Sequence, residues 1–412
     1  MSLAEGVQGV ISYKQYALGT MTATTEDQAP GTSGAQTLRR VASTLNLRKQ
    51  TYASAEVRPD RQIGDFRHGP RRVDGDISGE LSPATYTSFI EAVHRDTKAV
   101  GISASQADFT SITASASGSA FTMTGGDPVA KGFLIGDLIR FTGNTAVADN
   151  AKNFVITGFS GGSNRVVAVT PAPVDSTISS TFTMIGPGKS TIVPASGHVS
   201  RKFAIEVLHQ DLGQSRVFTE LRATKYALSL PATGMATITN SFLGRDQLSL
   251  TGGASPYFIA PAAITTTGII AAVSGSLLLG GVPVGVVTGL TIQCDLAPTP
   301  ATVTSQNFAA EVFLSHANVT GQITAYMTDT SFFDNFANEV ELELLVRLDT
   351  TLAANTPSMV FYLPRIKLGT ADLALTGESG QMITSSYQAL RFLGVTPGKT
   401  SSTIRCVDTD WT

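Results

Sequence analysis

The chain has 412 residues, of which 42% are hydrophobic and 15% are charged, and its net charge at pH 7 is -3. This hydrophobic fraction excludes general disorder, and the near-neutral charge excludes a global basic field that would draw the chain onto nucleic acid or an anionic membrane. The 39 glycines, together with many Thr, Ser and Val residues, favour short strands and tight turns, so we expect a mainly β fold.

A sharply sorted charge pattern begins at Arg58. The fifteen residues 58–72 contain five arginines and two aspartates, and the next eight contain Asp74, Asp76 and Glu80 without a basic residue. Within 73–81 small and apolar residues alternate with polar ones, which predicts a strand with one buried face. The sequence therefore predicts a basic loop, or arm, that leads directly into a strand with an acidic outer face.

An amphipathic helix is predicted after this strand. Its apolar residues follow the i, i+3, i+4, i+7 spacing of a helix that buries one side, at Tyr86, Phe89, Ile90 and Val93. Ser82 is the expected N-cap, with Pro83 in the first turn.

Residues 97–200 are predicted to form an inserted unit. They contain four or five short apolar segments, such as "GFLIGDLIRFTG" and "NFVITGFS", which Gly and Asn turns separate. We expect a small β-barrel domain that projects outward and can be removed without loss of the remaining fold.

The chain also contains an internal repeat. "VDGDISGEL" (73–81) resembles "VTGQITAYM" (319–327) at an offset of 246, and the helix positions match Phe333, Phe336, Ala337 and Val340 at an offset of 247. "ITNSF" (238–242) resembles "ITSSY" (383–387) at an offset of only 145, so the difference locates an insertion of 101 residues in the first repeat. We expect two tandem β-sandwiches, each with a flanking α-helix. The predicted domains are 1–96 with 201–250, the insertion 97–200, and a linker hairpin with the second repeat in 251–412.

Residues 269–290 are apolar and long enough to cross a bilayer. Pro283 and five glycines interrupt them, however, and no Lys, Arg, Trp or Tyr anchors flank them. We expect a β-hairpin that turns at Gly280–Gly281, and no membrane contact. Residues 1–16 lack the basic flank and apolar core of a signal peptide, which favours assembly in a cytoplasm.

Motifs that could indicate chemistry are incomplete. "GPGKST" (186–191) ends like a phosphate-binding loop, but Thr183 stands where the first glycine is needed. "DGDISG" (74–79) resembles the start of a calcium loop, but Thr85 replaces its final glutamate. The five histidines form no HExxH pair, and Cys294 and Cys406 fit no zinc spacing. We expect no enzyme, no cofactor and no bound metal.

Three segments carry a resemblance to a known family. They are "LRRVASTLNLRKQTYASAEVRPDRQIGDFRHGPRRVDGDISGELSP" (38–83), "SRVFTELRATKYALSLPATGMATITNSFLGRD" (215–246) and "GSLLLGGVPVGVVTGLTI" (275–292). They resemble the major tail tube proteins of long-tailed, siphovirus-type bacteriophages. The resemblance implies a structural virion protein that polymerises into stacked rings around the channel for the genome, in a tail assembled in the host cytoplasm. It also implies tape measure, tail terminator and tail tip proteins as partners, and genomic DNA that passes through the lumen without specific binding.

Rings of this family generally contain six sandwich folds, so a chain with two such folds implies homotrimeric, pseudo-hexameric rings. The arm is then expected to stack one ring on the next, and long loops between strands are where such contacts occur. The expected stacking residues are Arg58, Asp60, Arg61, Asp65, Arg67, His68, Arg71 and Arg72. The candidate lumen-facing residues are Asp74, Asp76 and Glu80, whose charge would repel DNA from the wall.

Two other classes stay open at this point. A virion decoration protein or adhesin with β-sandwich domains would share the composition, although it would need neither the repeat nor the arm. A glycan-processing tail enzyme would need paired carboxylates in a cleft.

Overall fold

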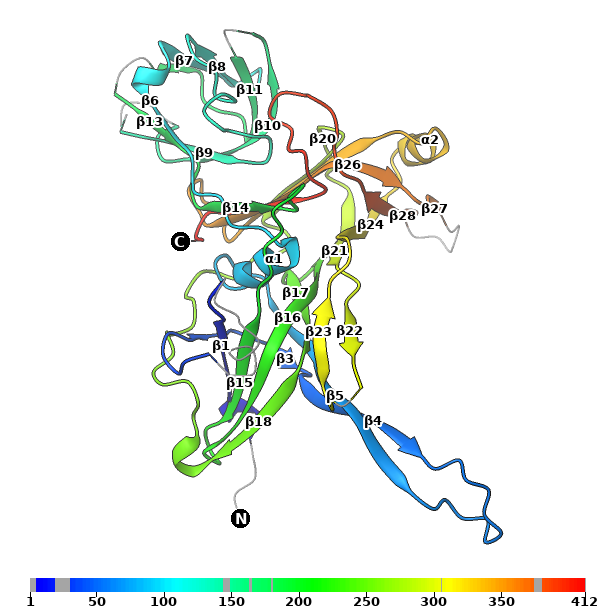
Figure 1. The fold of residues 1–412 in the computed structure, drawn as a ribbon. Coiled ribbons are helices and arrows are strands. Elements are labelled where there is room, and N and C mark those ends of the chain that lie inside the picture. Colours follow the sequence, from blue (N-terminus) through cyan, green and yellow to red (C-terminus); the bar gives the residue numbers. More distant parts are fainter. Residues whose placement is uncertain are drawn as a thin grey trace.

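The computed structural model of the chain is mainly β, with 49% of residues in strands and 6% in helices. The structure describes residues 5–18, 30–143, 149–162, 165–178, 181–304, 306–373 and 380–411. Within these ranges the strands form a sheet system of 19 strands, a separate eight-stranded sheet and a two-stranded hairpin (Figure 1).

The elements fall into three groups along the chain. The first repeat contains η1 (Gly6–Gln8), β1 (Gly9–Gln15), β2 (Gln36–Thr37), β3 (Ala42–Ser43), β4 (Asn46–Ala53), β5 (Phe66–Glu80), α1 (Thr87–His94), β15 (Phe203–His209), β16 (Gln214–Pro231), β17 (Thr237–Gly244), β18 (Asp246–Thr251) and η3 (Gly252–Ala254). The insertion contains β6 (Ser103–Ser105), η2 (Gln106–Asp108), β7 (Ser111–Ser115), β8 (Ala120–Thr124), β9 (Leu138–Thr142), β10 (Asn153–Ser160), β11 (Arg165–Thr170), β12 (Ser176–Ile178), β13 (Thr183–Ile185) and β14 (Lys189–Ile192). The second repeat contains β19 (Gly275–Leu279), β20 (Val282–Pro283), β21 (Val287–Asp295), β22 (Thr299–Thr302), β23 (Ala309–Phe313), β24 (Asn318–Tyr326), α2 (Ser331–Ala337), β25 (Leu342–Asp349), β26 (Ser358–Leu368), β27 (Asp372–Leu373), β28 (Met382–Ala389) and β29 (Arg405–Asp408).

Two sets of strands are paired in the same order of six positions, the last of which is shared by β3 and β4 in the first repeat. In the first repeat the order is β1, β15, β16, β17, β5 and then β3 with β4. In the second repeat it is β19, β25, β26, β28, β24 and β21. The first half of the long middle strand also pairs with the strand that comes last in each repeat along the chain, β16 with β18 and β26 with β29. This common order is what an internal duplication produces.

The register of the two sets also agrees. Ile238 of β17 is opposite Gly79 of β5, and Ile383 of β28 is opposite Ala325 of β24. The sequence offsets of 145 and 246 convert the first pair into the second. A β-bulge recurs near the start of β15 and near the start of β25. Because a slip of one residue would turn each side chain to the opposite face, the agreement is a stringent test of the duplicated pattern.

Strand β5 shows the predicted alternation. Val73 and Ile77 have no exposed surface, whereas Asp76 is exposed. Gly79 must lack a side chain, because a Cβ atom there would overlap the hydroxyl of Tyr86. That hydroxyl donates a hydrogen bond of 2.7 Å to the carbonyl oxygen of Arg39, so the segment before α1 is tied to the connection between β2 and β3.

Helix α1 begins later than predicted. Its N-cap is Tyr86, which makes no side-chain cap bond, and Ser82 is therefore not the cap. The Ser82 hydroxyl lies 2.7 Å from the Thr85 hydroxyl, and Ala84 has a left-handed backbone with φ of 61°, so a turn precedes the helix. The predicted apolar face is confirmed, since its members are buried.

The inserted sheet does not close into the predicted barrel. Its order is β12, β7, β8, β11, β10, β9, β13 and β6, and the two end strands are not paired with each other in the described chain. Phe133 and Ile135, from the segment between β8 and β9, fill its core. The core is completed from outside the insertion by residues of β19, β25, β26 and β29, namely Leu278, Leu345, Val360, Tyr362 and Val407.

The insertion is therefore packed onto the second repeat (Figure 1). Arg405 of β29 and Asp137 form a buried ion pair at 2.6 Å. Arg347 of β25 donates hydrogen bonds to the carbonyl oxygens of Asn153 and Thr170 in the insertion. These contacts argue against the expectation that the insertion can be removed without affecting the remaining fold, because it covers one face of the second repeat.

The apolar stretch before β21 forms the predicted hairpin. Leu279 of β19 pairs with Val282 of β20, and the turn between them consists of Gly280 and Gly281. Both glycines have positive φ, 60° and 80°, as this turn requires. No helix in the described residues has the length and hydropathy of a membrane span.

Candidate assembly surfaces

The motifs tested for catalysis fold as ordinary strands. The lysine of "GPGKST" begins β14, and "DGDISG" lies inside β5. The described residues contain no group of His, Cys, Asp and Glu that could hold a metal ion. Cys294 and Cys406 are buried, and burial raises the pKa of both thiols, which keeps them in the unreactive protonated form.

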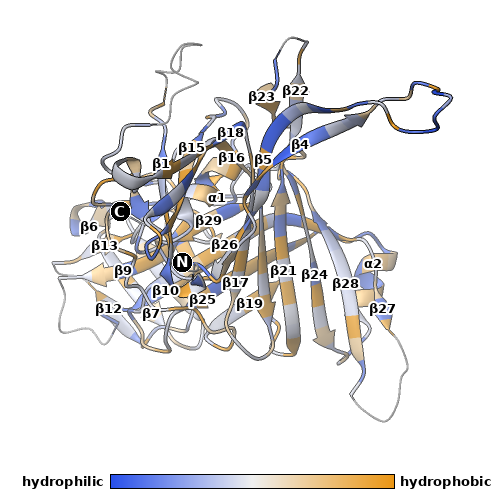
Figure 2. Ribbon diagram, turned by 90° about the horizontal axis from the view of Figure 1, so that it is seen from below, coloured by the Kyte–Doolittle hydropathy of each residue, from blue (hydrophilic) through white to orange (hydrophobic). Residues whose placement is uncertain are grey.

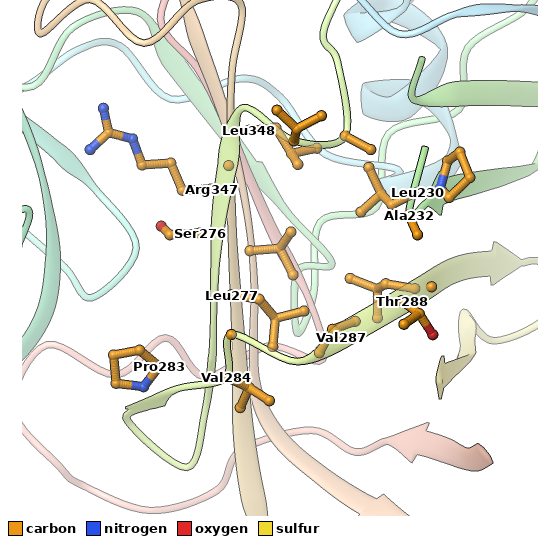
Figure 3. Close-up of a pocket in the computed structure, with 18 residues that line it drawn as sticks. Leu230, Ala232, Ser276, Leu277, Pro283, Val284, Val287, Thr288, Arg347 and Leu348 are labelled. Atoms are coloured by element: carbon orange, nitrogen blue, oxygen red, sulfur yellow. The ribbon is translucent and has the colours of Figure 1, made fainter. Parts of the chain in front are cut away.

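An apolar pocket of about 400 Å³ lies where β16, β19, β21 and β25 meet. The side chains that point toward one another there are Leu230, Leu277, Val284, Val287 and Leu348 (Figure 3). Arg347, the single charged residue of the lining, points to the other side of its strand. Apart from Arg347, the polar side chains of the lining are the hydroxyl groups of Ser276 and Thr288.

The predicted arm is a hairpin made by β4 and the first part of β5, and it extends well beyond the rest of the sheet (Figure 1). Near its end, Arg58 lies 3.3 Å from Asp60, and Arg67 lies 2.7 Å from Asp65. Arg61 is in the turn and has a left-handed backbone, with φ of 56°. Exposed pairs of this kind stabilise a fold little.

The base of the arm is held by the first repeat. Arg71 binds Asp246 of β18 at 2.5 Å, and Arg72 and Arg48 both bind Asp74. The His68 ring packs edge-on against Phe66 on the outer part of the arm. The eight predicted stacking residues thus divide into an anchored base and an exposed outer part.

The predicted acidic face lies on the outward side of β5. Asp76 is exposed and Glu80 is half-buried, but two arginines neutralise Asp74. The same sheet face continues across β17, β16, β21, β24 and β28, mainly through uncharged polar residues, with Lys225 of β16 opposite Asp295 of β21 (Figure 2). The uncharged residues include Thr239, Ser241, Thr291, Gln293, Thr320, Gln322, Thr384 and Ser386. The wall is therefore mainly neutral and polar, with acidic residues toward one edge.

The long sheet has two edges without a strand partner in the described chain. One edge is formed by β3 and β4, which pair with β5 only. The other is formed by β27 and the end of β26, which pair with β28. Leu373 of β27 is opposite Ile383, as Leu228 of β16 is opposite Ile238, so β27 corresponds to the second half of β16.

In the first repeat this corresponding edge is occupied. The second half of β16 pairs with β21 of the second repeat, from Lys225 opposite Asp295 to Pro231 opposite Gly289. The two repeats are thereby joined into one continuous sheet within the chain.

A hairpin of the second repeat also covers the first repeat. Glu311 of β23 binds Arg222 of β16 at 2.6 Å, and the Arg245 guanidinium lies 3.9 Å from the centre of the Phe308 ring. The backbone N–H of Arg71 donates to the carbonyl oxygen of Asn307 at 2.7 Å. Sequence reasoning missed this contact, and the only signal for it is that Glu311 is the single carboxylate in residues 296–317.

Asp408 joins the two repeats at a second place. It accepts hydrogen bonds from the backbone N–H of Ala84, at 2.7 Å, and of Asp410, at 2.9 Å. Burial raises the pKa of this carboxyl from 3.8 to about 7. The end of β29 is thus fixed to the turn before α1.

Comparison with known proteins places most of the chain in one family model. The model described as phage tail tube protein matches residues 7–389. No curated protein matches the chain.

Proposed function

Because the chain belongs to the phage tail tube protein family, we propose that three copies close into a ring, and that stacked rings form the tube through which the genome leaves the virion. The family makes this protein a structural component of the phage tail that assembles into a tube. One observation supports the proposed ring above all: the chain contains the same six-strand pattern twice, with one sheet edge open at each end.

Ring closure follows from the joint already present inside the chain. The second half of β16 pairs with β21. Strand β27 corresponds to that half of β16, and the β3–β4 edge corresponds to β21. Neither has such a partner among the described strands. An open strand edge presents unpaired N–H and C=O groups that bind another strand. We expect β27 of one copy to meet β3 and β4 of the next, which repeats the internal joint between copies.

Helix α2 supports the same interface. Its counterpart α1 is buried, but Phe336 of α2 and Val340, which follows the end of the helix, are 42% and 37% exposed. A neighbouring copy would cover these side chains in a closed ring.

Within this proposal each repeat is one tail-tube β-sandwich with a flanking helix. The first comprises 1–96 and 201–250, the insertion comprises 97–200, and the linker hairpin and second sandwich comprise 251–412. Three chains then supply the six sandwiches that the family resemblance implies for one ring.

The polar face of the long sheet is the proposed lumen wall. Serine, threonine and glutamine predominate, the cation Lys225 lies opposite Asp295, and Asp76 and Glu80 add local repulsion, so genomic DNA passes without specific binding. Replacing Thr320 and Gln322 by arginine would test this, because tubes with these cations should retain DNA at low salt. Equal DNA retention by variant and wild-type tubes would reject the lumen assignment.

The tip of the arm, around Arg58 and Arg61, is the proposed contact between rings. Ring stacking in one direction joins unlike surfaces, and the arm projects from one end of the sheet, opposite the end that holds the apolar pocket. The double variant Arg58→Glu with Arg61→Glu should form rings that do not stack. Tubes of normal length from this variant would show that the tip of the arm does not join rings.

Other virion proteins complete the proposed assembly. The tape measure protein would lie in the lumen during assembly, and terminator and tip proteins would bind the two ends of the tube, in the host cytoplasm. No catalytic step is proposed for this chain.

The test of the proposed function is assembly of the purified protein alone. At high concentration we expect rings and tubes in negative-stain micrographs, without cofactor or nucleic acid. A monomer at every concentration in analytical ultracentrifugation, with no rings in micrographs, would reject the proposal.

A further inference from the structure

We propose that the outer strand of the arm binds the second repeat of the neighbouring copy in the same ring, with Asp65 paired to Lys367. This inference rests on the proposed ring and names the surface that each copy offers to the arm. It follows from a contact between a hairpin and a repeat. The chain makes this contact on the first repeat, and the equivalent surface of the second repeat has no such hairpin on it.

The internal contact is the hairpin β22–β23 on the first repeat. Glu311 lies ten residues before Gly321 of β24, and Asp65 lies ten residues before Gly75 of β5, so the offset of 246 relates both pairs. The arm therefore corresponds to this hairpin, and its carboxylate stands at the same position. The hairpin bends between β23 and β24, at 314–317, and the arm has Gly69 and Pro70 at the corresponding positions.

The surface beneath the hairpin has a counterpart too. Arg222 is opposite Leu243, and Lys367 is opposite Gln388, so the offset of 145 relates Arg222 to Lys367. Arg222 binds the hairpin carboxylate and its side chain is 11% exposed, whereas the side chain of Lys367 is 34% exposed. A cation is present at this position in both repeats, but Lys367 pairs with the exposed Glu339 at 3.3 Å and has no covering hairpin.

The surrounding charges differ in a way that suits the arm. The Lys202–Glu220 pair beneath the hairpin, at 2.9 Å, is reversed in the second repeat, where Glu341 and Arg365 lie 2.5 Å apart. Glu341 alone would repel Asp65. The arm compensates with Arg67, two residues on, which is already 2.7 Å from Asp65 and has no charged counterpart in the hairpin, where Phe313 stands.

The chain cannot satisfy this contact by itself. The corresponding surface of the first repeat is already covered by the β22–β23 hairpin of the same chain. The arm extends away from the sheet (Figure 1). Within one chain, the second repeat sits against the first. If the next copy sits against the second repeat in the same way, its arm lies over Lys367. The occupant of this surface is therefore the arm of the next copy.

Cysteine cross-linking tests the geometry directly. Asp65→Cys combined with Lys367→Cys should give disulfide-linked species that end at the trimer on a non-reducing gel, because the links close around one ring. Glu56→Cys with Lys367→Cys is the matched control, because Glu56 lies in the part of the same arm that follows β4 rather than next to β5. This double variant should remain monomeric on the gel. The native Cys294 and Cys406 are buried and should not interfere.

Each alternative result overturns the inference. A ladder of cross-linked species well beyond three chains would mean that the arm docks on another ring. Rings of the double variant without cross-links would mean that the arm lies elsewhere. In both cases the proposed function would stand. Failure of the wild-type protein to form rings would reject both.

Charge exchange provides an independent measurement. Asp65→Lys and Lys367→Asp should each lower the assembled fraction in sedimentation by about tenfold or more, because each places like charges together. The two changes combined should restore assembly. Asp65 is exposed, and Lys367 is half-buried and loses only an ion pair with the exposed Glu339, so thermal unfolding of the monomer should change little. Double variants no better than the single ones would contradict the pair.

Discussion

Two glycines at equivalent positions, Gly75 and Gly321, exist because a neighbouring strand occupies the space of a side chain. A Cβ atom on Gly75 would meet the backbone of Thr44 and Leu45, and one on Gly321 would overlap the carbonyl of Thr291. The hydroxyl of Tyr387 is near the same point and donates a 2.8 Å hydrogen bond to that carbonyl. These contacts explain why both repeats keep glycine in this strand.

The first residue-scale prediction concerns this close approach. Gly321→Ala should lower the free energy of unfolding by about 1–3 kcal/mol, because the backbone of β21 must move to admit the methyl group. Urea unfolding followed by fluorescence measures the change. Gly285→Ala is the control, since nothing lies within 4 Å of a Cβ at that position. Equal stabilities of the two variants would contradict the argument.

The second residue-scale prediction concerns Asp408. The pKa of this carboxyl is about 7 in the folded protein and 3.8 in the unfolded chain. Between these pH values the folded state therefore keeps a proton that the unfolded state has released. The contribution of this group to the free energy of unfolding therefore falls as pH rises from about 4 to about 7, by at most about 1.4 kcal/mol per pH unit. Buried His94, whose pKa is lowered from 6.5 to about 3, acts in the opposite direction below pH 6.5.

A comparison of variants separates these two groups. The stability of the wild type minus that of Asp408→Asn should fall between pH 4 and pH 7 and stay constant above pH 7, because His94 is common to both proteins. Urea unfolding at several pH values measures this difference. A difference that does not change with pH would show that Asp408 is ionised throughout.

At the scale of elements, the insertion and the second repeat depend on each other. Strand β26 is buried on both faces along 358–364, because one face packs into the main core and the other against the insertion. A strand without alternation indicates cover on both sides. The apolar run "MVFYL" (359–363) carries this signal in the sequence, although it does not indicate which segment supplies the second cover.

The element-scale prediction is the loss of the fold when the insertion is removed. A deletion that joins His94 to Arg201 would expose Tyr362 and Val360 and leave Arg405 without Asp137. Exposing a large apolar side chain costs about 1.5–3 kcal/mol and several become exposed here, so we expect an insoluble or unfolded product. Circular dichroism and sedimentation of the deletion variant measure this. A soluble variant that still assembles would restore the interpretation of the insertion as a separable decoration.

Sequence patterns predicted the elements that local physics determines. The alternation in 73–81 gave β5, the glycine pair gave the hairpin at 280–281, and the two offsets matched the observed register. The helix start was missed because Ser82 bonds Thr85, a choice that depends on the turn at Ala84. The contact of Glu311 with Arg222 and the shared core of the insertion join distant segments, so no local pattern could specify them.

At the scale of the whole molecule, the chain contains one joint between repeats and lacks a second. The internal joint combines the β16–β21 pairing, the hairpin on Arg222 and the Asp408 contact with the turn before α1. The open β27 edge, the exposed surface around Lys367 and the exposed side of α2 are the corresponding parts of the second repeat. Because these three features occur together, one relative placement of two copies would satisfy them all.

The whole-molecule prediction is therefore a ring of three chains with pseudo-sixfold symmetry. Each chain supplies two sandwiches and one insertion, so the insertion should be seen on alternate positions around the ring, and the wall should alternate between two kinds of face. Asp74, Asp76 and Glu80 on one repeat correspond to Thr320, Gln322 and Tyr326 on the other. A reconstruction of the tube by electron cryo-microscopy measures the symmetry. Six chains per ring would contain twelve sandwiches and a much wider channel, and this result would contradict the argument from duplication. Three chains, with density for the insertion at every second sandwich, are the expected result.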